Sequence, residues 1–252
     1  MYDLSGRVAV ITGSGSRRGI GRSIAAAMAE QGATAVICDI NEAGIRESVQ
    51  AIKDAGGKAF GVPLDVTNQD SVDAMVKTVV GEFGKIDILV NNAGISQRVT
   101  VAEMTMDDVR KIFEVNLFGL IRCTKAVLPT MIEHHYGRIV SLSSAAGKRG
   151  GGFFGGAHYS ASKAAILGFS KNLAREVAAD GITVNSVAPG LINTDIWATM
   201  PKDVADKIID GVPMGRPGEP KEVAATICFL ASDEASYITG EDVDINGGSH
   251  MD

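Results

Sequence analysis

Short apolar runs alternate with longer helical patterns along the whole chain. The runs are bounded by turn-forming residues, which is typical of strands buried on both faces of a sheet; they cover residues 8–11, 35–38, 59–64, 86–90, 138–142, 182–187 and 242–245. The helical patterns cover residues 19–31, 42–55, 71–83, 106–134, 159–179 and 219–230. Because strands that alternate with helices pair in parallel, the sequence predicts an α/β fold with a doubly wound sheet of about seven strands and helices on both faces.

Nothing in the sequence divides the chain. It contains no linker, repeat or low-complexity tract, so we predict one domain over residues 1–252. Residues 194–211, with Trp197 and Met200, are predicted to form a lid over the site. Pro129 is expected to kink the helix over 106–134 or to end it early, because proline lacks a backbone N–H.

The net charge of −6 argues against nucleic acid or an anionic membrane as the main partner. The sequence contains no run of 18 apolar residues, so we expect no transmembrane span. The apolar run 8–11 is too short for a signal peptide. The three cysteines lie singly in apolar segments, and the four histidines show no ligand spacing. We therefore expect a cytoplasmic protein with buried thiols and no metal site.

A glycine-rich turn follows the first predicted strand. Residues 12–21 hold four glycines between that strand and a helix. Without Cβ atoms the backbone can approach a pyrophosphate, and the helix N-terminus supplies free N–H groups. This position favours a Rossmann-like dinucleotide site over a plain structural turn. Five residues separate Gly13 from Gly19, however, so the turn does not match G-x-G-x-x-G.

The end of the second predicted strand bears on which dinucleotide binds. Asp39 stands where a carboxylate can accept hydrogen bonds from ribose hydroxyls and repel a 2′-phosphate. Arg17 and Arg18 in the glycine turn favour the opposite choice, because arginine is a natural phosphate partner. We weigh the single acid under the ribose more heavily and predict NAD, with NADP as the alternative.

Tyr159 and Lys163 lie four residues apart at the start of a predicted helix, and so on the same face. A cation near a phenol favours the phenolate and lowers the phenol pKa from about 10. Such a phenol can take or give a proton near neutral pH. The alternative is a half-exposed tyrosine beside a surface lysine, and the other motifs of the chain disfavour it.

The motifs taken together resemble the short-chain dehydrogenase/reductase family over essentially the whole chain. The similarity rests on Thr12-Gly13 with Gly19-Ile20-Gly21, Asn91-Asn92-Ala93-Gly94, Asn116, Ser144, Tyr159 with Lys163, and Pro189-Gly190. Two departures matter. The glycine turn is two residues longer than the family's usual pattern, and residues 150–156 lengthen the stretch between the serine and the tyrosine.

The resemblance implies roles for the catalytic residues. Tyr159 would exchange a proton with the substrate oxygen, and Ser144 would bind the same oxygen. Lys163 would lower the pKa of the tyrosine and bind the nicotinamide ribose. Asn116 would hold a water that relays protons to solvent, although a buried helical asparagine also serves as a structural bond.

The resemblance also implies the dinucleotide contacts. Asp65 and Val66 would flank the adenine, residues 92–94 would lie against the ribose, and Ile192 and Thr194 would orient the carboxamide. Asn91 would equally serve to tie strands together. The full set of expected contacts is Gly13, Ser16, Arg18, Gly19, Ile20, Asp39, Asp65, Val66, Asn92, Ala93, Gly94, Tyr159, Lys163, Pro189, Gly190, Ile192 and Thr194.

The substrate is predicted from charge. The chain resembles both polyol or sugar dehydrogenases and 3-oxoacyl-carrier-protein reductases, and the latter need a basic patch for an acidic carrier. Residues 133–136 and 178–180, where such reductases carry basic residues, are neutral or acidic here. We therefore predict a small polyol, sugar or other secondary alcohol as the substrate. The alternatives are a 3-oxoacyl-carrier-protein reductase and a non-catalytic dinucleotide sensor.

Two further expectations concern His158 and assembly. His158, beside the catalytic tyrosine, would either touch a polar substrate or sit on the surface. The resemblance implies a homotetramer, with helices near 106–133 and 159–178 at the interface.

Overall fold

The computed structural model describes residues 2–151, 155–194 and 202–251. The sequence-predicted lid therefore lies partly outside the described residues, and Trp197 and Met200 lie wholly outside them. The described residues form one seven-stranded sheet in the order β3-β2-β1-β4-β5-β6-β7. Its strands are β1 (Val8–Thr12), β2 (Thr34–Asp39), β3 (Lys58–Pro63), β4 (Ile88–Asn91), β5 (Gly137–Leu142), β6 (Ile182–Pro189) and β7 (Asp242–Ile245).

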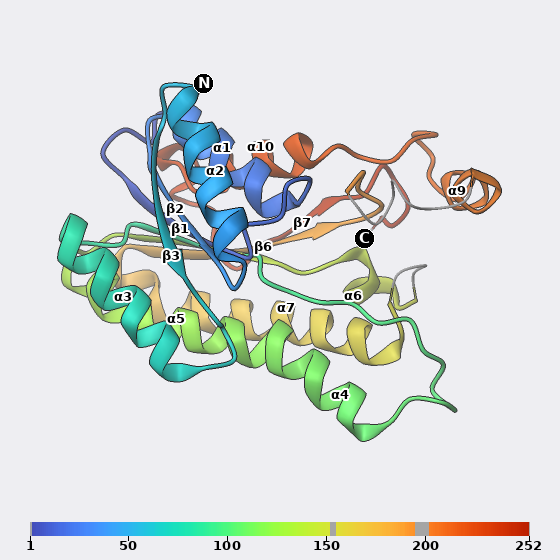
Figure 1. Ribbon diagram of the computed structural model, residues 1–252. Coiled ribbons are helices and arrows are strands. Elements are labelled where there is room, and N and C mark those ends of the chain that lie inside the picture. Colours follow the sequence, from blue (N-terminus) through green and yellow to red (C-terminus); the bar gives the residue numbers. More distant parts are fainter. Residues whose placement is uncertain (1, 152–154, 195–201, 252) are drawn as a thin grey trace.

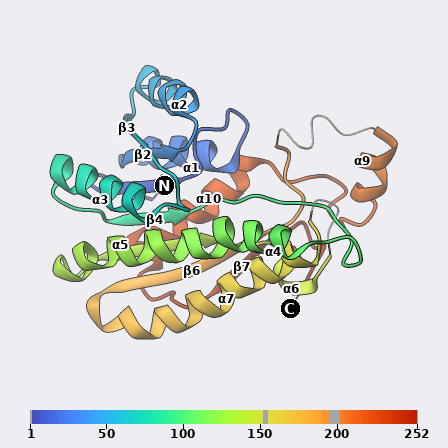
Figure 2. The ribbon, with the colours of Figure 1, turned by 60° about the horizontal axis from the view of Figure 1, so that its bottom comes forward.

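Every neighbouring pair of strands is parallel, so the prediction of a doubly wound parallel sheet is confirmed. Helices cover both faces of the sheet (Figures 1 and 2). One face carries α1 (Ile20–Glu30), α2 (Glu42–Asp54) and α10 (Pro220–Leu230). The other carries α3 (Gln69–Phe83), α4 (Met106–Phe113), α5 (Gly119–Glu133) and α7 (Ala157–Val177).

Each face of the sheet has its own hydrophobic core. β1 shows how this arises, since alternate residues of one strand point to opposite faces. Ala9 and Ile11 belong to the core under α1 and α10, whereas Val8 and Val10 belong to the core under α3, α5 and α7. All four side chains are buried. This two-sided burial is why the strands read as continuous apolar runs in the sequence.

The long helix predicted over 106–134 breaks at a different place from the one expected. A π-helical segment, Glu114–Phe118, separates α4 from α5, while Pro129 lies inside α5 and the helix continues to Glu133. The prediction of an early end at Pro129 is therefore wrong. By length and hydropathy alone, Met106–Glu133 also meets the criterion for a membrane-crossing helix, but α5 packs against α3, β4 and β5 as a core helix.

Two short helices were not predicted. α6 (Ala145–Arg149) follows β5, and α9 (Lys202–Ile209) follows β6. Both stand beyond the carboxyl ends of strands, on the right-hand side of Figure 1. The strand order reverses between β1 and β4, and open α/β sheets bind ligands in the crevice at such a point.

Candidate active site

The glycine turn runs from β1 to the start of α1 at this crevice. Gly13 has a φ of +65°, and a Cβ there would come within 2.8 Å of the Ala93 Cα. Gly19 caps α1 without any side-chain hydrogen bond, so the first N–H groups of the helix are open to an anion. Ser16 and Arg18 lie exposed in the same turn, and Ile20 opens the helix. This turn fits the pyrophosphate of a dinucleotide.

Asp39 lies directly beneath the glycine turn. Its carboxylate accepts hydrogen bonds from the Gly15 N–H at 2.8 Å and from the Asn41 N–H at 2.9 Å. Both bonds fix the carboxylate at the end of β2. Arg17 turns away to the side, where its guanidinium pairs with Glu47 of α2 at 3.2 Å. The acid is thus held in place by the backbone, whereas the arginine is held by an exposed ion pair.

Asn92 joins the turns after β1 and β4. Its side-chain amide donates to the carbonyl oxygens of Thr12 and Gly13, each at 2.8 Å. The Thr12 hydroxyl accepts from the backbone N–H groups of Asn92 and Ala93 at 3.0 Å. The side chain of Asn92 therefore shapes the cleft together with the Thr12 hydroxyl, a role that was not predicted for Thr12. Asn91 is structural as well, since its amide donates to Thr124 of α5 at 3.0 Å.

Asp65 and Val66, which were predicted to flank the adenine, differ in exposure. Asp65 is exposed, and one of its oxygens accepts from the N–H and hydroxyl of Thr67. Val66 is buried, and Gly119 of α5 approaches it so closely that a Cβ there would lie 2.7 Å from a Val66 methyl group. Because that side chain serves the core, only the Val66 backbone is left to face a ligand.

The turn after β6 is fixed by the C-terminal part of the chain. Gly190, after Pro189, donates its N–H to Ile245 at 3.0 Å, and a Cβ on Gly190 would lie 2.8 Å from that of Asn246. Ile192 is buried and pairs with Gly218, and its carbonyl accepts from the Thr194 N–H at 2.9 Å. This turn lies at the same edge of the sheet as the glycine turn.

Ser144 and Tyr159 meet beyond the end of β5. Ser144 caps α6, where its hydroxyl accepts from the Ala146 N–H at 3.1 Å. The phenol of Tyr159 is hydrogen-bonded with the Ser144 side chain. Ser143 is turned the other way and donates to the Lys163 carbonyl at 2.8 Å. The alternation of side chains along the strand therefore selects Ser144 for the site.

Lys163 is buried beside Tyr159. Its Nζ lies 5.9 Å from the centroid of the tyrosine ring and donates to the Leu142 carbonyl at 2.7 Å. Burial lowers the pKa of Lys163 to about 8. Burial also raises the pKa of the Tyr159 phenol, and the hydrogen bond with Ser144 opposes that rise. The prediction of a Tyr159 pKa below its usual value is therefore wrong for this structure, because desolvation is the largest cause of the shift.

Asn116 lies in the π-helical segment and braces three elements. Its Oδ1 accepts from the Ile95 N–H at 2.8 Å, and its Nδ2 donates to the Ile95 carbonyl at 3.0 Å and to Ser162 at 3.1 Å. Ser162 in turn donates to the Tyr159 carbonyl at 2.8 Å. A Cβ on Gly94 would lie 3.3 Å from Asn116 Oδ1 and 3.5 Å from Lys163 Nζ. The side chain of Asn116 thus has a structural role here.

Two glycines beside the site have a steric role that was not predicted for them. A Cβ on Gly147 of α6 would lie 2.8 Å from the Ala164 backbone nitrogen of α7. A Cβ on Gly155 would lie 2.7 Å from the Tyr159 Cγ. Both positions need glycine because a helix or a ring approaches the backbone closely. The only sequence signal is the glycine-rich run 150–156, which contains Gly155 but not Gly147.

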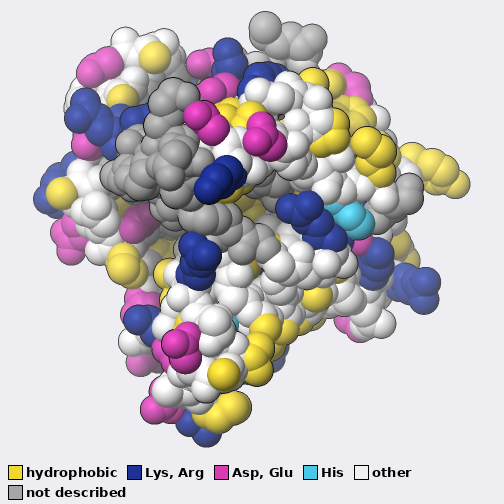
Figure 3. Space-filling model, turned by 90° about the vertical axis from the view of Figure 1, so that its right-hand side faces the viewer, with side chains coloured by type: hydrophobic (Ala, Val, Ile, Leu, Met, Phe, Trp, Pro, Cys, Tyr) yellow, Lys and Arg dark blue, Asp and Glu magenta, His cyan; other side chains and the backbone are white. Residues whose placement is uncertain are grey.

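The carboxyl edge of the sheet, which Figure 3 presents, carries Lys and Arg side chains across its centre. Arg149 of α6 is one exposed cation at this edge, and its guanidinium donates to the Ser249 carbonyl at 2.8 Å. No cluster of three or more His, Cys, Asp or Glu suited to a metal ion occurs within residues 2–151, 155–194 and 202–251.

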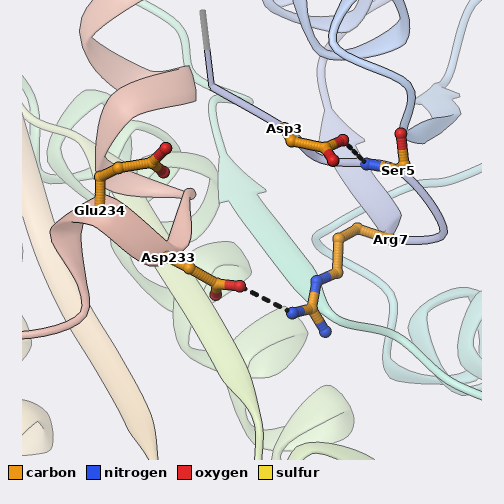
Figure 4. A pocket seen from close by; sticks show the side chains of 5 residues that line it. All are labelled: Asp3, Ser5, Arg7, Asp233 and Glu234. Atoms are coloured by element: carbon orange, nitrogen blue, oxygen red, sulfur yellow. Dashed lines mark hydrogen bonds and ion pairs between the residues drawn. The ribbon is translucent and has the colours of Figure 1, made fainter.

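The opposite edge of the sheet holds a separate pocket of about 420 Å³. Figure 4 shows Arg7 in it, pointing toward Asp233, with which it pairs at 3.2 Å. The remaining lining residues are Asp3, Ser5 and Glu234. The guanidinium groups of Arg7 and Arg138 lie 3.6 and 4.3 Å from the Tyr136 ring centroid. These contacts join the amino ends of β1 and β5 far from the candidate site.

Comparisons with known proteins find matches over nearly the whole chain. The model of a family described as Enoyl-(Acyl carrier protein) reductase matches residues 13–250. The chain is 43% identical over 249 residues to the 3-oxoacyl-[acyl-carrier-protein] reductase FabG of Vibrio cholerae, with 99% of each sequence covered. It is 43% identical over 250 residues to FabG of Escherichia coli, again with 99% of each covered.

Two solved structures have the same fold as this chain over almost its whole length. The crystal structure of a 3-oxoacyl-[acyl-carrier protein] reductase from Brucella melitensis has a TM-score of 0.92 and 38% identity, covering 98% of this chain and 92% of the other. The crystal structure of gox2181 has a TM-score of 0.94 at 38% identity, covering 98% and 96%.

These relatives overturn the predicted substrate class, and a polyol, sugar or other small secondary alcohol is wrong as the main assignment. The structure explains the error. Residues 133–136 and 178–180 precede β5 and β6, so they lie at the amino ends of those strands. The candidate site lies at the carboxyl ends. The charge of those two segments therefore does not describe the charge at the site of the same subunit.

Proposed function

The chain belongs to the short-chain dehydrogenase/reductase family, and on that premise we propose that it reduces the 3-oxo group of an acyl thioester borne by an acyl carrier protein. As a member of the family it is an oxidoreductase that acts on a CH–OH group with a nicotinamide dinucleotide. The proposal is carried by the full-length identity of 43% to proteins named 3-oxoacyl-[acyl-carrier-protein] reductase.

In the proposed reaction, Ser144 and Tyr159 hydrogen-bond the 3-oxo oxygen from two sides. A dinucleotide held by the residues of the glycine turn would supply hydride to C3. As negative charge develops on the oxygen, the Tyr159 phenol gives its proton to it and a 3-hydroxyacyl thioester forms. The raised pKa of Tyr159 suits a proton donor, because the phenol is fully protonated at neutral pH. The Lys163 ammonium then stabilises the phenolate until it is reprotonated.

The rate of reduction should depend on pH through Lys163. Burial favours the uncharged amine and lowers the Lys163 pKa to about 8. Below that pH the ammonium is present and stabilises the phenolate, and above it the charge is lost. We therefore expect kcat for reduction to be constant at neutral pH and to fall as the pH rises through about 8. A kcat that stays constant well above this pH, with hydride transfer rate-limiting, would contradict the assignment of Lys163.

For the cofactor we propose NAD over NADP. The support is the carboxylate of Asp39, which two backbone N–H groups hold beneath the glycine turn. A 2′-phosphate placed there would meet a fixed negative charge. Pro189, Gly190, Ile192 and Thr194 would hold the nicotinamide end, and Asp65 and Val66 the adenine end.

The change Asp39→Asn tests this preference. It removes the charge at nearly constant volume, and the remaining side-chain oxygen can accept from one of the two backbone N–H groups. We expect the affinity for NADPH to rise about fivefold relative to NADH, because a nearby surface charge is worth on the order of 1 kcal/mol. Kd values from fluorescence titration with both dinucleotides measure the effect. Asp70→Asn, in the first turn of α3, is the control, and an unchanged ratio in Asp39→Asn would refute this role.

The substrate test compares thioesters with alcohols. The purified protein is assayed with 3-oxobutyryl-carrier protein, with the 3-oxobutyryl thioester of a small thiol, and with secondary alcohols, using both dinucleotides. We expect the highest kcat/KM for the carrier-bound thioester. Higher kcat/KM for every alcohol than for either thioester would overturn the proposed function.

We also propose a cytoplasmic homotetramer. The three cysteines are free and buried, in keeping with a reducing compartment. Met106, Phe118 and Ile132 expose apolar side chains along α4, the π-helical segment and α5, and a second copy would cover them. The mass in solution, by sedimentation or light scattering, tests this state.

A further inference from the structure

His158 is buried, although it stands beside Tyr159 in the first turn of α7. Only 3% of its surface is exposed, so it does not sit on the surface as one sequence interpretation held. Its Nε2 lies 3.3 Å from the side-chain oxygen of Gln97, in the loop between β4 and α4. The proposed mechanism does not use this imidazole.

Gln97 holds two helices at once. Its backbone carbonyl accepts from the Gly156 N–H at 2.8 Å, and its side-chain Nε2 donates to Asp108 Oδ1 at 2.7 Å. Because a carboxylate only accepts, the amide nitrogen faces Asp108 and the amide oxygen faces His158. The Nε2 of His158 must therefore be the protonated nitrogen of the neutral ring. Its Nδ1 is buried without a hydrogen-bond partner among the described residues.

The Asp108 carboxylate is held in place at the end of this series of hydrogen bonds. It forms a capping box with Thr105 at the start of α4, in which its Oδ2 accepts from the Thr105 N–H at 2.9 Å. Hydrogen bonds from Thr105 and then Gln97 lower the pKa of Asp108 to about 2. The carboxylate thus stays charged over the working pH range, and the orientation of the Gln97 amide is fixed with it.

The first turn of α7 needs such support. Gly156 caps the helix without a side-chain hydrogen bond, and Tyr159 is the third residue after that cap. The first N–H groups of a helix have no partner within it, so an uncapped first turn frays readily. The contacts of Gln97 with Gly156 and His158 take the place of the missing cap. They act on the turn that carries the Tyr159 phenol.

We infer that His158 and Gln97 are positioning residues, which brace the catalytic helix against α4 and so place the Tyr159 phenol toward the reacting oxygen. This inference rests on the proposed function, in which Tyr159 gives the proton. A displacement of a reacting group by about 1 Å can cost as much as 10² in rate, so the brace acts on turnover. The dinucleotide contacts of the glycine turn lie on other elements and should be untouched.

The test uses His158→Phe, Gln97→Met and His158→Gln. The first two remove the bond, and we expect kcat for reduction to fall at least tenfold while Kd for the dinucleotide stays unchanged. His158→Gln keeps an N–H donor of similar reach and should retain most of the activity. The double variant should be no slower than the slower single variant, because both changes remove one interaction. Gln69→Met is the matched control, since Gln69 makes the same kind of bond to Asp73 on exposed α3.

A second readout is independent of activity. In ¹⁵N-histidine-labelled protein in alkaline buffer, His158 should show an Nε2–H tautomer in the wild type, and the chemical shift of that hydrogen-bonded N–H should change in Gln97→Met. Wild-type kcat in both His158→Phe and Gln97→Met, with Tyr159→Phe inactive, would overturn the inference and leave the proposed function standing. An active Tyr159→Phe variant would instead overturn the proposed function. Loss of dinucleotide binding in parallel with kcat would also overturn the positioning role.

Discussion

Replacing Tyr159 by phenylalanine is expected to abolish reduction while dinucleotide binding is preserved. The phenol hydroxyl is the group that donates the proton, and general acid catalysis of this type contributes about 10² to 10⁴ in rate. The phenyl ring keeps the contact with Gly155 behind it, so the helix should not shift. The decisive measurement is kcat for 3-oxobutyryl thioester reduction, together with Kd for NADH.

The control for this change is Tyr237→Phe, because Tyr237 is fully exposed and far along the chain from the site. It should behave as the wild type. If the kcat of Tyr159→Phe stays within about tenfold of the wild-type value, the hydroxyl contributes less than the roughly 10² or more that is expected of a general acid. In that case another group must supply the proton, and the assignment of Tyr159 fails.

Lys163→Met should give the second largest loss, of at least about 10² in kcat, because it removes the buried cation that stabilises the phenolate. The methionine fills nearly the same volume but cannot donate to the Leu142 carbonyl, which the lysine reaches at 2.7 Å. We also expect the fall in rate near pH 8 to disappear, since that ionisation belongs to Lys163. A pH–rate profile of the variant measures both effects.

Lys125→Met on the exposed side of α5 is the matched control and should leave the profile unchanged. A Lys163→Met variant that is slow but still loses rate near pH 8 would place that ionisation on another group. The explanation of the pH dependence would then be wrong, even if Lys163 matters for turnover.

The sheet was predictable because its strands are buried on both faces. Val8 to Ile11 read as one apolar run, since α1 and α10 cover one side and α3, α5 and α7 the other. The position of Asp39 at a strand end was equally readable. The hydrogen bond from Gly15 that fixes its carboxylate was not, because it joins residues on two different turns.

The errors share one physical cause, which is the tertiary environment. Pro129 was expected to kink its helix or end it early, but α5 continues past it to Glu133, and the break falls instead at the π-helical segment that carries Asn116. The pKa of Tyr159 was expected to fall with a lysine one turn away, yet burial raises it. Spacing along a helix predicts which side chains are neighbours, but it does not give their desolvation.

Some of the site residues could be predicted from the sequence and others could not. The spacing of Tyr159 and Lys163 and the position of Ser144 after a strand could be read directly. The brace of Gln97 and His158 could not, because it joins a loop after β4 to a helix some 60 residues later in the chain. Its partners are ordinary polar residues with no distinctive spacing.

The central claim is that hydride reaches the carbonyl carbon of a 3-oxoacyl thioester and the proton reaches its oxygen. The most direct measurement offers the protein equal concentrations of 3-oxobutyryl- and 2-butenoyl-carrier protein with NADH deuterated at C4, followed by mass analysis of the products. The proposed reaction predicts a 3-hydroxybutyryl product with deuterium at C3 and no saturated butyryl product. A deuterated butyryl product with the 3-oxo thioester left unreduced would contradict it, and would mean that the protein reduces the carbon–carbon double bond.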